Sequence, residues 1–112
     1  MTTEQGLPRA QPGRALTVLF GSNFKVGQTA EFAHIALTRM GHRVIAFSPS
    51  PDAPPDWLRT PPDVDMIELV KGLGAAPDMF LMVESSVGTP FLPRRIAELE
   101  IPTGYWMYDN YL

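Results

Sequence analysis

The fold of this chain is decided by the stretch Ala15-Leu16-Thr17-Val18-Leu19-Phe20-Gly21-Ser22-Asn23-Phe24, which leads into a helical segment after Gly27. A short apolar run rich in branched and aromatic residues predicts a buried strand. The Gly-Ser-Asn that ends the run predicts a tight turn. This stretch is therefore the first strand of a β-α unit, and the rest of the chain is interpreted outward from it.

The segment after this strand has helical periodicity from about Gln28 or Thr29 to Met40. Gly41 is suited to the left-handed conformation that ends a helix. The expected buried face consists of residues spaced i, i+3, i+4, i+7, with two more that widen it: Ala33, Ala36, Leu37 and Met40, then Phe32 and Ile35. A second apolar run over residues 43–48 completes a right-handed parallel crossover.

Beyond residue 48 the chain alternates further between breaker-rich and apolar segments. Residues 49–62 contain six of the twelve prolines and predict a stiff surface connection, with Trp57 as a possible anchor. A helix is expected from Thr60-Pro61-Pro62-Asp63. The remaining elements are a near-continuously apolar strand over 78–84, a short helix over about 93–99 and an aromatic strand over 103–108.

These elements predict an α/β fold: a Rossmann-like parallel sheet of about four strands, in the order 2-1-3-4, with flanking helices. Residues 1–14 are expected to be a flexible leader and residues 15–112 one incomplete domain. The net charge of −3 gives no reason to expect nucleic acid as a partner. No apolar run is long enough for a membrane span, and we expect a cytoplasmic protein without disulfides.

Ligands of open parallel sheets bind at the carboxyl ends of the strands. The predicted ligand-binding residues at these ends are Gly21, Ser22, Asn23, Ser85 and Ser86. The loop from Gly21 to Gly27 could hold an anion or a sugar hydroxyl through its backbone N–H groups, with Lys25 adding charge, or its glycines could only permit the turn. It has neither the dinucleotide nor the Walker spacing.

Two carboxylates, Glu84 and Asp109, also follow predicted strands and could each act as a general base toward a hydroxyl. Either could instead bond to local backbone. We expect His34 to be a solvated residue on the polar face of the first helix, and we assign no role to His42. Two distant histidines and no cysteine predict no metal site.

Several of these segments resemble a known family. The run 78–84, Leu92-Pro93-Arg94-Arg95, the run 99–103 and Trp106-x-x-Asp109 are similar to the N-terminal region of CgeB-like (spore-maturation-type) glycosyltransferases. The first β-α-β resembles that of GT-B glycosyltransferases in general. The family often continues Asp-Thr-His where this chain has Asp109-Asn110-Tyr111, so a histidine role is not carried over.

The resemblance implies the N-terminal, acceptor-side half of a GT-B enzyme. A C-terminal domain outside this chain would bind the nucleotide-sugar donor without an essential metal, and this chain would bind no cofactor and would be inactive alone. Its partners would be a sugar acceptor and that donor domain. Two rivals are a flavodoxin-like FMN-binding module, which the hydroxyls near Gly27 faintly suggest, and a non-catalytic α/β interaction domain that uses the proline-rich loop and the aromatic strand.

Overall fold

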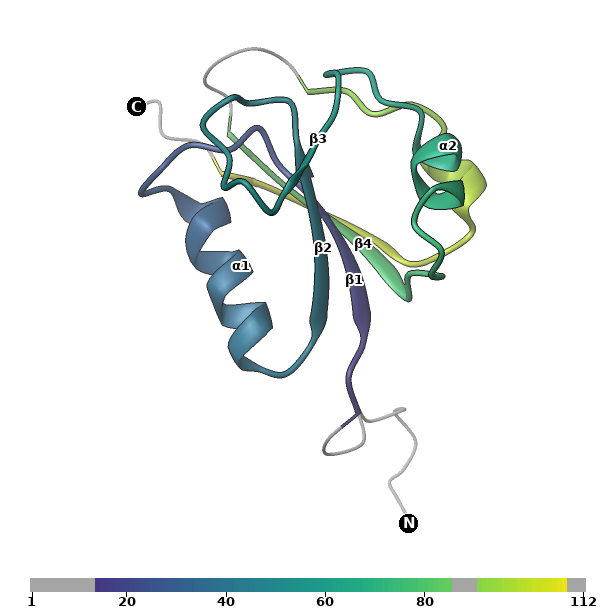
Figure 1. Cartoon of the computed structure of the whole chain (residues 1–112), viewed down its shortest axis with the longest axis horizontal. Helices are drawn as coiled ribbons and strands as arrows, with labels where there is room; N and C mark the ends of the chain where they lie inside the picture. Colours follow the sequence, from purple (N-terminus) through teal and green to yellow (C-terminus); the bar gives the residue numbers. More distant parts are fainter. Residues whose placement is uncertain (1–13, 86–90, 109–112) are drawn as a thin grey trace.

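A computed structural model describes residues 14–85 and 91–108. Its elements are β1 (Thr17–Gly21), α1 (Thr29–Arg39), β2 (Arg43–Ser48), β3 (Leu58–Arg59), α2 (Met66–Lys71), β4 (Met79–Ser85), the 3₁₀ helix η1 (Ile96–Leu99) and β5 (Thr103–Tyr108). All strand pairs in the five-stranded sheet are parallel (Figure 1). The predicted Rossmann-like α/β fold is therefore confirmed.

The sheet has the order β3-β2-β1-β4-β5. The four predicted strands follow one another as 2-1-3-4, and the sheet gains one strand that the sequence did not predict. This strand, β3, pairs with the end of β2 through two residues only, Phe47 with Leu58 and Ser48 with Arg59. Both β3 residues are exposed. The proline-rich segment contains no apolar run that would predict a buried strand there.

Helices cover the two faces of the sheet separately, α1 on one side and α2 with η1 on the other (Figure 1). Successive strand residues point to opposite faces, and the core is accordingly divided into two clusters. Leu19, Phe47 and Phe80 pack under α2 and η1. Phe20 and Val83 pack under α1. The strands are almost continuously apolar because their side chains fill two core layers, one on each face of the sheet.

Helix α1 ends as predicted, since Gly41 has a φ of +93°. The expected buried face is wrong in part. Ala33 and Leu37 do pack toward the sheet, but Phe32 is 60% exposed and Met40 68%, with Ile35 and Ala36 exposed as well. The helix is apolar around most of its circumference, so the periodicity alone did not determine which side faces the sheet.

Helix α2 begins later than predicted. Its N-cap is Asp65, whose carboxylate accepts hydrogen bonds from the backbone N–H groups of Ile67 and Glu68. Thr60 instead continues from β3, and its N–H donates to the Ser48 carbonyl at 3.1 Å. Met66 of α2 is buried in the core, and Leu69 and Val70 pack against the same cluster.

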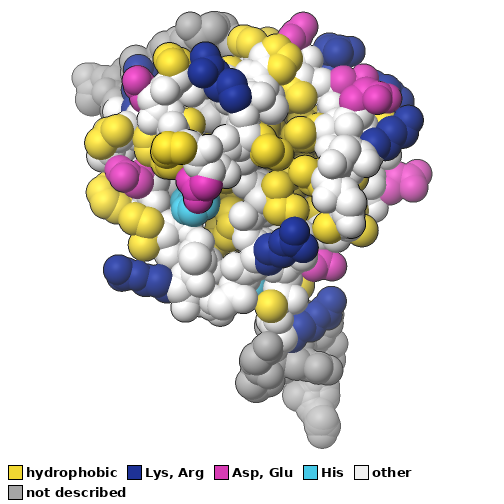
Figure 2. Space-filling model, in the orientation of Figure 1, with side chains coloured by type: hydrophobic (Ala, Val, Ile, Leu, Met, Phe, Trp, Pro, Cys, Tyr) yellow, Lys and Arg dark blue, Asp and Glu magenta, His cyan; other side chains and the backbone are white. Residues whose placement is uncertain are grey.

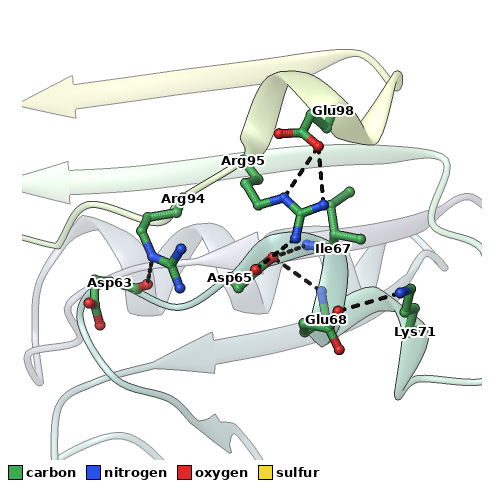
Figure 3. Close-up of polar contacts among 8 residues, drawn as sticks. All are labelled: Asp63, Asp65, Ile67, Glu68, Lys71, Arg94, Arg95 and Glu98. Carbon is green, nitrogen blue, oxygen red and sulfur yellow. Dashed lines mark hydrogen bonds and ion pairs between the residues drawn. The ribbon is translucent and has the colours of Figure 1, made fainter.

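The segment expected to be helical over 93–99 is shorter, with only the four residues of η1. It lies between two non-glycine residues with positive φ, Arg95 (67°) and Glu100 (57°). Figure 3 shows how Arg95 is held: its Nη1 donates to Asp65 at 2.9 Å, and its Nε and Nη2 donate to Glu98 at 3.2 Å. The hydrogen bond from Arg95 lowers the pKa of the Asp65 carboxyl. These contacts fix a turn that sequence patterns did not predict.

Among the helices of the described residues, none combines the length and the apolar character that a membrane crossing requires.

Candidate ligand-binding site

A hollow of about 290 Å³ lies at the carboxyl edge of the sheet, between the loop after β1 and the segment after β2. Its lining residues come from both segments: Asn23, Lys25, Pro49, Ser50, Pro51, Asp52 and Pro62. Carboxyl edges are where open parallel sheets bind ligands. Small-molecule pockets span roughly 300–1,000 Å³, so this hollow has room for one small ring.

Ser48 joins the two walls of the hollow. It is the last residue of β2 and is fully buried. Its Oγ accepts a hydrogen bond from the Phe24 N–H at 3.1 Å and another from the Ser50 N–H at 3.0 Å. The Ser50 Oγ in turn accepts from the Asp52 N–H at 3.1 Å. A short run of hydrogen bonds therefore fixes the backbone on both sides of the hollow.

Aromatic packing beside the hollow fixes the same two segments. Phe24 and Trp57 are 2% and 7% exposed, and their ring centroids lie 5.0 Å apart. Trp57 also contacts Phe20 of β1 edge to face, with centroids 5.8 Å apart. The anchoring role predicted for Trp57 is confirmed, and this packing holds the proline-rich segment against the sheet.

His34 belongs to this aromatic cluster, which corrects the expectation of a solvated histidine. Its ring lies 5.2 Å from that of Trp57 and 5.9 Å from that of Phe20. Burial lowers the pKa of the imidazole, while the nearby Asp56 carboxylate opposes this shift. The expectation was wrong because the side of α1 that faces the sheet carries His34 as well as Ala33 and Leu37. His42 lies elsewhere, where its Nδ1 accepts from the Leu16 N–H at 3.1 Å.

Three backbone N–H groups of the loop after β1 are used within the chain. The N–H of Ser22 donates to the Phe47 carbonyl at 3.3 Å, and that of Phe24 to Ser48. The N–H of Gly27, next to the start of α1, donates to the Glu31 carboxylate at 2.7 Å. An acid thus already lies where a phosphate would bind at this helix terminus.

The predicted ligand-binding residues occupy different places. Asn23 lines the hollow. Ser22 is buried, at 3% exposure. Gly21 is packed in the sheet, where a Cβ would lie 2.6 Å from the Phe47 ring. Glu84 and Ser85 end β4 and therefore reach the same carboxyl edge. Two further predicted residues lie outside the described ranges: Ser86 and Asp109.

Sequence reasoning overlooked Asp52. It named Lys25 as a charge in the loop after β1 and did not place it opposite the segment after β2. Asp52 stands four residues past the end of β2 in the proline-rich segment, which predicted only a connection. The signal that could have found it is its position after a strand end. Pairing of this segment with β2 through β3 brings it back to the sheet edge.

A second hollow, of about 380 Å³, lies between α1 and the strands β4 and β5. Its lining is almost wholly apolar: Thr29, Phe32, Ala33, Ala36, Leu37, Leu81 and Trp106. We call it the apolar groove. Elsewhere, a band of hydrophobic side chains runs between α1 and α2 on the face in Figure 2, with charged side chains mainly around it. In residues 14–85 and 91–108, no group of three potential metal ligands is found.

Comparisons of the chain with protein-family models, with curated proteins and with solved structures give no match. The function is therefore inferred from the fold and from the site itself.

Proposed function

We propose that this chain is the acceptor-binding α/β domain of a glycosyltransferase, an enzyme that transfers a sugar from a nucleotide-sugar donor to an acceptor hydroxyl. The observation that carries the proposal is the hollow at the carboxyl edge. An amide, a hydroxyl, a carboxylate and an ammonium group surround a space of monosaccharide size. Polar groups of this kind recognise sugar hydroxyls, and the rings of Pro49, Pro51 and Pro62 offer apolar surface to the C–H groups of a sugar.

The proposed chemistry places the acceptor hydroxyl near the ends of β1 and β4. A carboxylate, Glu84 or Asp109, would take the hydroxyl proton as the oxygen attacks the anomeric carbon of the donor. The bond from that carbon to the donor phosphate would break, and the nucleotide would leave. Asn23, with Ser85, would orient the acceptor. A second domain would hold the donor, as the resemblance to GT-B enzymes implies.

The FMN-binding alternative has less support. Its phosphate would approach the start of α1, where Glu31 already accepts the Gly27 N–H. A carboxylate there would repel a phosphate dianion. The interaction-domain alternative uses the proline-rich loop and the aromatic strand. Trp106 of that strand lines the apolar groove, which offers surface for burial but almost no polar atoms for recognition.

The proposal is tested with the whole 112-residue chain, isotopically labelled for amide NMR. Addition of methyl glucoside and methyl glucuronoside should shift amide signals of the two segments that line the hollow. The same chain mixed with nucleotide sugars should release no nucleotide, because donor binding is assigned to another domain. Turnover by this chain alone, or unchanged spectra with every sugar, would contradict the proposal. A yellow chromophore on purification would favour the FMN module instead.

A further inference from the structure

Two opposite charges line the hollow without pairing. Lys25 and Asp52 are both exposed lining residues. The ion pairs within the described residues involve other groups, namely Lys71 with Glu68 and Arg95 with Asp65 and Glu98. The hollow therefore presents an ammonium group and a carboxylate that do not neutralise each other.

The backbone at the base of each charged residue is fixed. Asp52 is held through its own N–H, which donates to the Ser50 Oγ at 3.1 Å. Lys25 follows Phe24, which is 2% exposed and whose N–H donates to Ser48. The two charged residues thus lie on different walls of the hollow, and both walls are hydrogen-bonded to the Ser48 hydroxyl. A ligand in the hollow would meet two charged side chains that extend from backbone positions set before it binds.

We propose that the hollow selects an acidic sugar, a ring that carries a carboxylate or a phosphate. This inference rests on the sugar-binding function proposed above. The Lys25 ammonium group receives the anionic substituent, and the Asp52 carboxylate accepts hydrogen bonds from ring hydroxyls. Lys25 is the one basic residue among those that line the hollow. A neutral sugar offers it no countercharge, whereas one anionic group gives a charge-assisted contact.

A ligand with several phosphates fits less well than a singly anionic sugar. Asp52 places a carboxylate in the same lining, which contains no cation besides Lys25. Additional negative charge on the ligand would face the Asp52 carboxylate without a second cation to balance it. The charge pattern therefore favours a monosaccharide unit with one acidic substituent.

The test compares three probes by amide NMR titration of the whole chain: methyl glucuronoside, glucose 6-phosphate and methyl glucoside. At least one acidic sugar should bind about tenfold more tightly than the neutral one, the effect of one hydrogen bond to a charged group. The two acidic probes distinguish a carboxylate from a phosphate. Sodium acetate and inorganic phosphate, added alone, should bind more weakly than the corresponding sugar.

Variants separate the two charges. Lys25→Gln should weaken binding of the acidic sugars much more than binding of the neutral sugar, so that the preference for acidic sugars is lost. Asp52→Asn should weaken binding of all three sugars while the preference stays. Lys71→Gln is the matched control, because it removes the same charge from α2, where Lys71 pairs with Glu68, and it should change nothing. The two-dimensional amide spectrum of each variant shows whether it is folded.

The outcomes are distinguishable. Equal binding of all three sugars, or a preference that persists in Lys25→Gln, would overturn the acidic-sugar inference and leave the sugar-binding function standing. Binding of free phosphate or acetate as tight as that of the sugars would reduce the hollow to an anion site and overturn the inference. Failure of every sugar to bind would overturn the proposed function itself.

Discussion

Two of the hollows in the described part of the chain differ in how their walls are made. The hollow at the carboxyl edge, which we call the polar hollow, has polar lining groups. Hydrogen bonds to the buried Ser48 and the packing of Trp57 hold its loops. The apolar groove is larger, and its walls are side chains of a helix and two strands, with Trp106 still 48% exposed. The first can recognise a ligand by its polar atoms. The second can only bury apolar surface.

The contrast shows that one face of a parallel sheet can be covered by packed side chains over some strands and left partly uncovered over others. Under α1, the strands β1 and β2 are covered, as the burial of Phe20 and Ala46 shows. The same face of β4 and β5 presents Leu81 and Trp106 to the groove. Stability should therefore depend strongly on residues around the polar hollow and weakly on those around the groove.

The two tryptophans give the largest expected difference. Trp57→Ala should lower the free energy of unfolding by about 3–5 kcal/mol, because it empties a buried aromatic site. Trp106→Ala, the matched control on the groove, should cost less than about 1 kcal/mol, since its side chain is half exposed. Urea unfolding followed by circular dichroism measures both. Equal losses for the two variants would remove the distinction between the regions.

The hydroxyl of Ser48 comes next in expected size. Ser48→Ala leaves the N–H groups of Phe24 and Ser50 without their acceptor, and we expect a loss of about 1–3 kcal/mol. Amide exchange at Phe24 and Ser50 should become faster as well. Thr38→Ala is the control: the Thr38 hydroxyl donates to the carbonyl of His34 on the exposed side of α1, and its removal should cost less than about 0.5 kcal/mol. Unchanged exchange at both amides would show that Ser48 does not hold the loops.

A pH effect at His34 is the smallest of the three. Burial lowers the pKa of His34 in the folded chain, so the unfolded chain binds this proton more readily. Stability from this group is present above about pH 6.5, the ordinary histidine value, and is lost as the pH falls through the lower folded pKa. Urea midpoints measured from pH 7.5 to 5 should decline less in His34→Gln than in the wild type. Parallel declines would place the titration elsewhere.

The sequence predicted most of the sheet and less of its coverings. Long apolar runs such as 78–84 specify buried parallel strands, and glycine at position 41 specifies a helix end, so both were predicted correctly. The side of α1 that faces the sheet was predicted only in part, because Phe32, Ile35 and Ala36 make the exposed side of the helix apolar as well. β3 was missed because it depends on pairing with β2 and has no pattern of its own.

The sequence predicted where in the fold the candidate site lies, but it identified only some of the residues that line the site. The carboxyl edge follows from the topology, and Asn23 was named from it. Asp52 was not, because its place in the lining of the hollow depends on how the proline-rich segment returns to the sheet edge. The hydrogen bond from the Gly27 N–H to the Glu31 carboxylate was not predicted. No sequence pattern distinguishes a helix N-terminus whose N–H groups bind a side chain from one whose N–H groups are available to a ligand.

The central claim is that the polar hollow, and not the apolar groove, is where this protein recognises a sugar. The most direct measurement is a residue-resolved map of amide shifts on titration with methyl glucuronoside. The account predicts shifts at Asn23, Lys25, Ser50 and Asp52, with the signals of Phe32 and Leu81 unmoved. Shifts confined to the groove, with the hollow silent, would contradict it.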